Sequence, residues 1–273
     1  MPSAPDPATA QRMRKAFEYA ASVFGLRPAG DAETWGWDGK TLSGPVTSGR
    51  WLRVAAALTE KAARAAWDGA ETAQEAMPDS VPRPRLENVR QWSEATYTYR
   101  AEVHERIEGG VISSTVMPPS GLDLPDAWWG SLRNALGAVS EVPTDRVAIR
   151  QERLHWAMPE FLGIQVDTEI PEWATLHADI QWSNLVGPEL CILDWERWGL
   201  GPAGYDEANL YVSSLSEPSV ADRVQREFAP ALASPSGRFS QLVVAGEYLQ
   251  GIGRGNNLEL EAPLRELVAR LLG

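Results

Sequence analysis

The sequence has few of the residues that bind zinc or form disulfides. It contains one cysteine, Cys191, and three histidines, so an internal disulfide is impossible and no zinc-ligand spacing can be recognised. Cys191 lies in an apolar run, which predicts a small buried apolar side chain. A Gly-x-Ser-x-Gly segment is also missing, which disfavours a Ser-His-Asp hydrolase.

Basic residues and long apolar runs are scarce as well. The chain has 25 Lys and Arg against 37 Asp and Glu, a net charge of −12, which disfavours binding to a nucleic-acid backbone. No apolar run approaches the ~18 residues of a membrane-spanning helix. The polar, proline-rich start does not resemble a signal peptide. We therefore expect a cytoplasmic protein with neither a membrane nor a nucleic-acid partner. Its acidity fits a cationic small-molecule substrate, and fits a role in solubility alone equally well.

Residues 175–196 combine three polar side chains with short apolar runs. Asp179 is followed by Asn184 and then by Asp194. The apolar runs 185–186 and 190–193 are separated by Gly187-Pro188, a pattern that predicts a hairpin. Such a hairpin would return Asp194 to the loop that carries Asp179 and Asn184. Carboxylate and amide oxygens at one place suit Mg²⁺.

The order His177-Ala178-Asp179, Asn184, Asp194-Trp195 resembles the catalytic segment of aminoglycoside phosphotransferases, members of the protein-kinase-like superfamily. The resemblance implies that Asp179 is the catalytic base and that Asn184 and Asp194 hold Mg²⁺ on ATP or GTP. Ala178 departs from the glycine usual in that family, which would be costly if the backbone φ there is positive. Taken singly, Asp and Asn in loops most often make turns or caps.

The same resemblance implies a two-lobed α+β fold. Residues 1–108 would form an N-lobe that covers the nucleotide. This lobe would contain an antiparallel sheet and a helix. Residues 109–273 would form a mainly helical C-lobe with the catalytic loop and the acceptor pocket. The side-chain patterns predict the following elements: disorder over 1–8; an amphipathic helix that Gly25 ends; three short strands within 34–57; a helix over 59–77 that Asp68-Gly69 bends or splits; strands near 86–93 and 96–107; and helices near 128–139, 145–161, 206–215, 219–231, 238–252 and 262–272.

In the N-lobe, the resemblance points to Arg53 and Glu71 at the phosphates. The strand that should present a lysine carries Arg53, and the preceding hairpin has no Gly-x-Gly-x-x-Gly. Arg53 either binds phosphate or is an outward-facing charge on an edge strand. Glu71, in the predicted helix, either pairs with Arg53 or is solvated. Lys40 and Lys61 remain alternative phosphate-binding cations.

The hinge between the lobes should lie just after the strand 96–107, before Glu108-Gly109-Gly110. By resemblance, the backbone around Glu105 and Ile107 would bind adenine. Further along the chain, Asp206 fits a structural Asp that follows a Gly-Pro turn, and it also fits a helix N-cap.

Acidic and aromatic residues accompany the proposed site. The candidates for contact with a cationic acceptor are Glu196, Glu207 and Glu247. Trp182, Trp195 and Trp198 flank the catalytic segment and either stack on a substrate or pack in the core.

The sequence therefore predicts a Mg²⁺-dependent phosphotransferase. It would move the γ-phosphoryl group of ATP or GTP to a hydroxyl of an aminoglycoside-like, sugar or amino-alcohol acceptor. The alternative is a kinase-shaped regulatory protein that binds a nucleotide or metabolite without turnover. Retention of Asp179, Asn184 and Asp194 opposes that alternative, because buried carboxylates are expensive to keep without a purpose.

Overall fold

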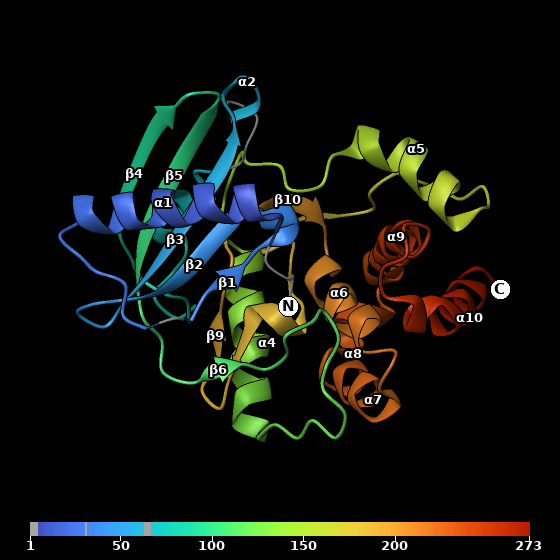
Figure 1. The fold of residues 1–273 in the computed structure, drawn as a ribbon. Helices are drawn as coiled ribbons and strands as arrows, with labels where there is room; N and C mark the ends of the chain where they lie inside the picture. The colour runs from blue at the N-terminus through green and yellow to red at the C-terminus, as the bar shows by residue number, and fades with distance from the viewer. Residues whose placement is uncertain (1–4, 31, 63–66) are drawn as a thin grey trace. The chain divides into compact units, whose positions relative to one another are not determined.

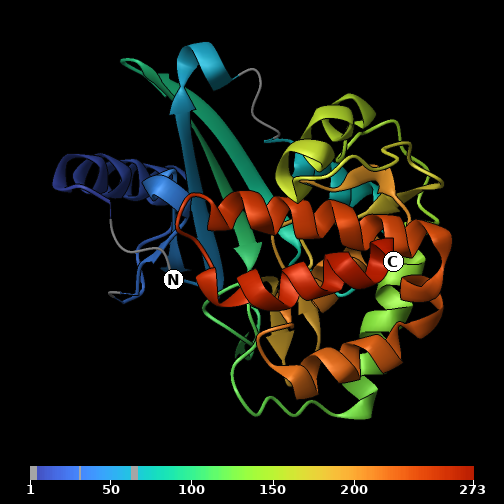
Figure 2. The same cartoon turned by 90° about the vertical axis from the view of Figure 1, so that its right-hand side faces the viewer.

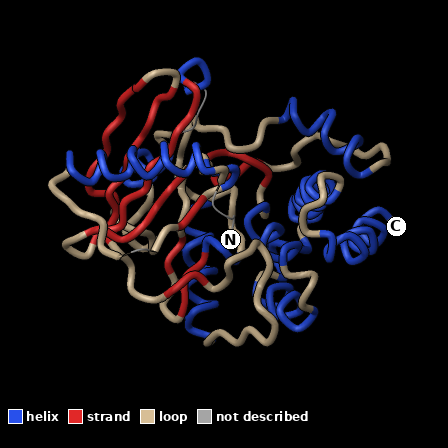
Figure 3. The backbone as a smooth tube through the Cα atoms, in the orientation of Figure 1, coloured by secondary structure: helices blue, strands red, loops and turns tan. Residues whose placement is uncertain are grey.

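The computed structural model describes residues 5–30, 32–62 and 67–273. The chain divides into two compact units, which we describe separately. The first comprises Met1–Glu75 and Arg83–Glu108, and the second comprises Ala76–Pro82 and Gly109–Gly273. The sequence predicted an N-lobe over residues 1–108. Residues 76–82 instead cluster with the second unit. The mixed α+β class is confirmed: strands dominate the first unit and helices the second (Figure 3).

An antiparallel five-stranded sheet forms the centre of the first unit. Its strand order is β1-β2-β3-β5-β4. The strands are β1 (Thr34–Trp35), β2 (Thr41–Val46), β3 (Arg50–Leu58), β4 (Leu86–Glu94) and β5 (Tyr97–Glu105). The expected strands are therefore confirmed. A tight turn with positive φ at Ser48 and Gly49 joins β2 to β3.

Helix α1 (Pro7–Val23) covers one face of this sheet (Figure 1). Asp6 caps the helix by accepting hydrogen bonds from the backbone N–H groups of Ala8 and Thr9. The predicted apolar face, including Met13 and Phe17, packs against buried residues of β2, β3 and β5. Because α1 begins at Pro7, the disorder expected over residues 1–8 is wrong for its last two residues, and residues 1–4 lie outside the description.

The helix expected over 59–77 is divided. Its described parts are α2 (Thr59–Ala62) and α3 (Gly69–Ala76), and residues 63–66 lie outside the described ranges. The α3 helix begins at the Asp68-Gly69 pair, where the sequence predicted a bend or break. Ala73 and Met77 are buried, as their spacing predicted.

In the second unit, helices surround two small sheets. The helices are α4 (Asp126–Ser140), α5 (Gln151–Leu162), α6 (Tyr205–Ser213), α7 (Pro218–Glu227), α8 (Ala229–Ala233), α9 (Pro235–Ile252) and α10 (Glu261–Leu272). The long helix α9 packs against α5, α6, α8 and α10. Figure 2 shows α9 and α10, in red, running side by side. Among the described residues, no helix has the length and apolarity needed to span a bilayer.

Two helix boundaries differ from the sequence prediction. The helix expected over 145–161 begins only at Gln151. The helix expected over 219–231 is broken at Phe228 into α7 and α8. Pro230 accounts for the break at Phe228, because proline lacks the N–H needed in a helix interior and is tolerated only in a first turn.

The small sheets carry the catalytic segment. One pairs β7 (Trp173–Leu176) with β10 (Gly199–Pro202), and the other has the order β6 (Gly110–Val111), β8 (Leu185–Gly187), β9 (Cys191–Ile192). Gly109 precedes β6 with a φ of +96°, and a Cβ there would lie 2.6 Å from the carbonyl oxygen of Gly187. Only glycine fits this position without a shift of the backbone. Cys191 is buried on β9, as predicted.

Candidate active site

The loop after β7 holds Asp179 and Asn184 against each other. The side-chain nitrogen of Asn184 donates to the backbone oxygen of Asp179 at 2.9 Å and to its carboxylate Oδ2 at 2.9 Å. A short 3₁₀ turn, Trp182–Asn184, sets this geometry. The contact uses the amide nitrogen of Asn184, so its carbonyl oxygen Oδ1 is the atom that could bind a cation.

The predicted hairpin is confirmed and brings Asp194 to the same region of the second unit. Strands β8 and β9 pair Leu185 with Ile192, and the backbone N–H of Leu193 donates to the carbonyl of Asn184 at 2.8 Å. Asp194 follows directly, has an exposed side chain and adopts a φ of +63°. The hairpin therefore places Leu193, the residue before Asp194, beside Asn184.

Asp206 braces the start of the catalytic loop. Its Oδ2 accepts from the backbone N–H of His177 at 2.7 Å, and its Oδ1 accepts from that of Ala178 at 2.8 Å. The expected structural role is thus what the geometry shows. The expected N-cap role is wrong, because Gly204 occupies the cap of α6 and the carboxylate of Asp206 is directed to another segment. Burial and the neighbouring Glu207 raise the pKa of Asp206 to about 7.

His177 ties the loop to the hairpin rather than facing solvent. The ring is fully buried, and its Nε2 lies 2.9 Å from the carbonyl oxygen of Leu193. A carbonyl only accepts, so Nε2 carries a proton. Burial lowers its pKa to about 4. The ring of Trp195 packs edge-on against it, with centroids 4.6 Å apart. His177 is therefore built to position the loop.

Ala178 has a φ of +66°, the left-handed region that the sequence analysis identified as costly for a non-glycine residue. Its side chain is buried. The two hydrogen bonds to Asp206 hold the adjoining peptide groups in this conformation. Together with Asp194, this places backbone strain on both sides of the proposed site. Such strain persists only where the surrounding structure enforces it.

A group of charged and phenolic side chains surrounds Asp179 within the second unit. Burial raises the pKa of Asp179, whereas the guanidinium of Arg197 and the hydrogen bond from Asn184 act to lower it. The hydroxyl of Tyr205 donates to Glu247 at 2.6 Å, and Arg153 lies 3.5 Å from the other oxygen of Glu247. The sequence analysis did not select Arg197 or Tyr205, although both lie in the segment between Asp194 and Asp206.

The tryptophans beside the catalytic segment belong to the core. Trp182, Trp195 and Trp198 are 0%, 5% and 2% exposed. Trp182 packs on Trp128 and Trp129 and donates to the hydroxyl of Ser214 at 2.9 Å. Of the two interpretations of these residues, core packing is therefore confirmed.

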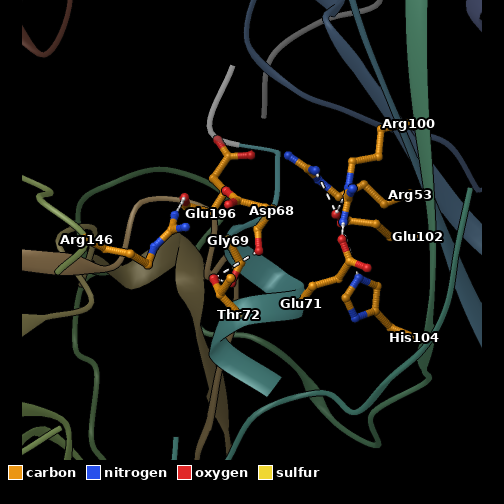
Figure 4. Close-up of polar contacts among 10 residues, drawn as sticks. All are labelled: Arg53, Asp68, Gly69, Glu71, Thr72, Arg100, Glu102, His104, Arg146 and Glu196. Carbon is orange, nitrogen blue, oxygen red and sulfur yellow. Dashed lines mark hydrogen bonds and ion pairs between the residues drawn. The ribbon is translucent and has the colours of Figure 1, made fainter. Parts of the chain in front are cut away.

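Arg146 secures the segment after Asp194. Its guanidinium donates to the backbone oxygen of Glu196 at 3.5 Å (Figure 4). It also donates to the backbone oxygen of Trp198 at 3.2 Å and lies over the ring of Trp198. These contacts fix a turn that would otherwise depend only on short strands. The sequence offers no local pattern that marks Arg146 for this role.

In the first unit, the helix carboxylate pairs with a different arginine from the one expected. Glu71 of α3 forms an ion pair with Arg100 of β5, and Arg53 contacts Glu102 at 3.5 Å (Figure 4). The predicted Glu71–Arg53 pair is therefore replaced by Glu71–Arg100. The strand register explains the exchange, because Arg53 on β3 lies directly opposite Glu102 on β5.

The proposed hinge segment ends the first unit. The backbone N–H of Glu105 donates to the carbonyl of Arg85 at 2.9 Å, and that of Arg106 donates to Gly49 at 3.2 Å. These two N–H groups are engaged within the unit. Of the two residues predicted to bind adenine, Ile107 is the better candidate for a backbone donor, and Glu105 could contribute its carbonyl.

The donors near Asn184 fit Mg²⁺ held jointly with a nucleotide. Within residues 5–30, 32–62 and 67–273, no three or more His, Cys, Asp or Glu side chains gather in a way that could hold a metal ion. Asn184 and Asp194 can offer two oxygens from adjacent backbone positions. Mg²⁺ is commonly held by one or two protein ligands, with substrate phosphates and water completing its shell.

Solved structures of similar fold include phosphotransferases and kinases of small molecules. The apo structure of the aminoglycoside phosphotransferase APH(4)-Ia matches with a TM-score of 0.64 and 15% identity, covering 93% of this chain and 97% of that one. A putative fructosamine-3-kinase from Haemophilus somnus 129PT matches at 0.54 and 11%, covering 96% and 99%. The choline kinase LicA from Streptococcus pneumoniae matches at 0.52 and 12%, covering 94% and 98%.

These similarities confirm the protein-kinase-like fold. APH(4)-Ia has also been solved in a ternary complex with AMP-PNP and hygromycin B. No protein-family model and no curated protein sequence matches the chain. At such low identities, the likeness establishes the fold, and the chemistry must be argued from the residues of this chain.

Proposed function

We propose that this protein is a Mg²⁺-dependent phosphotransferase that moves the γ-phosphoryl group of ATP or GTP to a hydroxyl of a small molecule. The observation that carries the proposal is the side-chain contact of Asn184 with Asp179, beside a hairpin that returns Asp194 to Asn184. A loop that only turned the chain would not need Asp206, His177 and a strained Ala178 to hold it.

Asp179 is the proposed general base. Asn184 engages its Oδ2, so Oδ1 can accept the proton of the acceptor hydroxyl. Burial raises its pKa, which makes the carboxylate a stronger base than an exposed aspartate. Arg197 acts in the opposite direction and favours the ionised carboxylate. The main contribution would be orientation of the hydroxyl, since phosphoryl transfer depends mostly on positioning and charge stabilisation.

Asn184 and Asp194 are the proposed metal ligands. Asn184 would contribute its Oδ1 and Asp194 its exposed carboxylate. When bound with the nucleotide, Mg²⁺ would neutralise charge on the phosphoryl oxygens. The hydrogen bond from Leu193 to Asn184 keeps the two ligand positions adjacent.

The acceptor is proposed to be an aminoglycoside-like, sugar or amino-alcohol compound. Solved proteins of similar fold include an aminoglycoside phosphotransferase, a choline kinase and a putative fructosamine kinase, which supports this range. Glu247 is engaged by Tyr205 and Arg153, and burial raises the pKa of Glu207. The charges of Glu196 and Glu247 both act on Asp179, so these two residues are the candidates to contact a cationic group on the acceptor.

A thermal-shift experiment tests the nucleotide and metal parts of the proposal. ATP or GTP at ~100 times its dissociation constant, with Mg²⁺, should add about 2.7 kcal/mol of stability, a shift of several degrees. Asp194→Ala should remove the Mg²⁺-dependent part. Asp194→Asn is the companion variant, since asparagine tolerates the positive φ better than alanine. Asp38→Asn is the matched control, because Asp38 is also exposed and has a φ of +54°.

A Mg²⁺-dependent shift that is lost in Asp194→Ala, weakened in Asp194→Asn, which keeps an oxygen but loses the charge, and kept in Asp38→Asn would support the proposal. The next step would be a screen for the acceptor. No shift with either nucleotide would refute phosphotransfer from ATP or GTP. It would favour the alternative of a kinase-shaped protein that binds another metabolite without turnover.

A further inference from the structure

The second unit contains a cavity that shares no lining residue with the candidate active site. Its volume is about 400 Å³, and its walls come from helices α6, α7, α8, α9 and α10. These helices lie together in Figure 1, and α9 contacts α6, α8 and α10. A concave space of this size is typical of sites that bind small organic molecules. The side chains around the cavity determine which kind of molecule would fit.

Apolar side chains form much of the cavity wall. Leu232 of α8 and Leu267 of α10 are buried, and Leu271 lies one turn beyond Leu267 on the same side of α10. The buried ring of Tyr211 on α6 adds an aromatic surface. An apolar body on a ligand would leave water to contact these side chains, which favours binding. The wall therefore suits a molecule whose main part is apolar.

Two neutral polar groups belong to the same wall. Gln241 is buried, and its side-chain nitrogen donates to the carbonyl oxygens of Leu232 at 2.9 Å and Gly237 at 3.1 Å. Both N–H donors of the amide are thereby used, so Oε1 is the atom left to accept a hydrogen bond. Within the described part of the chain, neither Oε1 of Gln241 nor the hydroxyl of Tyr211 has a hydrogen-bond partner. A hydroxyl group on a ligand would find a partner in either residue.

The charged residues of the wall are arginines. Arg238 of α9 and Arg270 of α10 line the cavity with exposed side chains, and no described Asp or Glu lines it. Arg238 donates to the carbonyl oxygen of Leu271 at 3.0 Å, which fixes its guanidinium beside α10. Among the described residues, no carboxylate forms an ion pair with either arginine. In a chain with 37 acidic and 25 basic residues, two uncompensated guanidinium groups at one cavity favour an anionic ligand.

The charged and the neutral polar groups occupy different depths. Arg238 and Gln241 are three residues apart on α9, so they lie on one side of the helix, roughly 4.5 Å apart along its axis. Arg238 is exposed and Gln241 is buried. On α10, Arg270 is likewise exposed and Leu267, three residues earlier, is buried. Positive charge therefore marks the outer end of the cavity, and a neutral acceptor and apolar side chains mark its inner end.

We infer that this cavity binds a small hydroxylated carboxylate with an apolar body. The carboxylate would face outward to Arg238 and Arg270, because a planar guanidinium matches a carboxylate through two parallel N–H···O bonds. The apolar body would contact Leu267, and the hydroxyl would bond at the inner end to Gln241 or Tyr211. This site is additional to the proposed phosphotransfer and does not depend on it, since none of its residues belongs to the catalytic segment.

Titration calorimetry with a hydroxynaphthoate, whose carboxylate and hydroxyl stand at opposite ends of the ring system, tests the class of ligand. The wild-type protein should bind it. The corresponding hydroxynaphthamide has the same shape without the charge and should bind about tenfold or more weakly, the loss typical of charge-assisted hydrogen bonds. Naphthoate, which lacks the hydroxyl, should bind about threefold to tenfold more weakly. Inorganic phosphate, which has no apolar body, should not compete with the hydroxynaphthoate.

Two pairs of variants test the location. Arg270→Gln should weaken hydroxynaphthoate binding by about tenfold to a hundredfold. Its control is Arg265→Gln, since Arg265 is also exposed on α10 but pairs with Glu261 and does not line the cavity, and binding should stay within about twofold. Ala233→Trp should abolish binding by filling the cavity from an exposed position. Ala269→Trp adds the same ring at an exposed position of α10 outside the cavity and should leave binding intact.

Three results would overturn the inference. They are no binding of the hydroxynaphthoate at millimolar concentration, equal binding of the acid and the amide, and equal binding by Arg270→Gln and Arg265→Gln. If Ala233→Trp fails to fold, Ala229→Phe replaces it, because Ala229 is also exposed and lines the cavity. The titrations use neither nucleotide nor acceptor, so they succeed or fail independently of the proposed phosphotransfer.

Discussion

Buried carboxylates are held in opposite ways in the two units. Glu102 of the first unit is surrounded by cations, and its pKa is lowered to about 2. Asp206 of the second unit accepts two backbone N–H groups beside Glu207, and its pKa is raised to about 7. In the first unit, cations therefore compensate the charge of Glu102. In the second unit, the neutral backbone N–H groups of His177 and Ala178 hold Asp206 and fix the loop after β7.

This difference predicts different consequences for function. Under the proposed function, loss of charge among the paired residues around Glu102, which are Arg53, Glu71, Arg100 and His104, should change the affinity for nucleotide. Loss of a carboxylate in the catalytic loop should change turnover. The two kinds of variant therefore separate binding from chemistry, and the predictions below run from the largest expected effect to the smallest.

Asp179→Asn should lower kcat by about 10²- to 10⁴-fold, the range for loss of a general base. Asparagine can still accept the hydrogen bond from Asn184 through its side-chain oxygen, so the loop geometry should survive. Turnover would be measured with an acceptor identified by screening, and MgATP affinity by calorimetry. Asp222→Asn, an exposed position on α7, is the control. An affinity that falls along with turnover would mean that Asp179 is not the base.

As the pH falls, the contributions of His177 and Glu102 to stability should be lost over different pH ranges, while Asp206, whose pKa is raised to about 7, contributes with the opposite sign in the upper range. Burial lowers the pKa of His177 from 6.5 to about 4, so the unfolded chain binds the proton first and stability falls between those values. Glu102 has its pKa lowered from 4.5 to about 2, so its contribution is present above 4.5 and is lost towards 2. Each loss amounts to about 3 kcal/mol.

Urea unfolding at a series of pH values measures both effects. His177→Gln, which can keep a donor near the carbonyl of Leu193, should flatten the pH dependence only in the upper range. Glu102→Gln should flatten it only in the lower range. If the two variants alter stability in the same pH range, the predicted separation of the His177 and Glu102 contributions is wrong.

Ala178→Gly should leave the free energy of unfolding within about 1 kcal/mol of wild type. Relief of the positive φ gains about 1–2 kcal/mol, while the lost methyl group costs about 0.8 kcal/mol and the added chain entropy about 0.5–1 kcal/mol. Ala245→Gly is the control, since Ala245 is buried in the regular helix α9 and should lose about 2 kcal/mol. Equal losses in urea unfolding would show that Ala178 is not strained in solution.

Much of the fold followed from local patterns. The alternation of β5, the apolar face of α1 and the Gly187-Pro188 turn between β8 and β9 each depend on residues close in the sequence. The break at Pro230 was equally local and was missed because the apolar pattern runs across it. Asp179, Asn184 and Asp194 could be grouped because one hairpin brings them together.

The sequence by itself determined most of the elements and the hairpin that follows Asn184, because periodicity and turn chemistry act over a few residues. Only the tertiary structure decided the long-range partners: Arg100 for Glu71, Glu102 for Arg53, and Asp206 for the backbone of His177. These pairings depend on strand register and on the packing of segments about 29 residues or more apart, as the separation of Asp206 and His177 illustrates. The sequence shows the chemical type of each polar side chain, but the tertiary structure determines which residue it contacts.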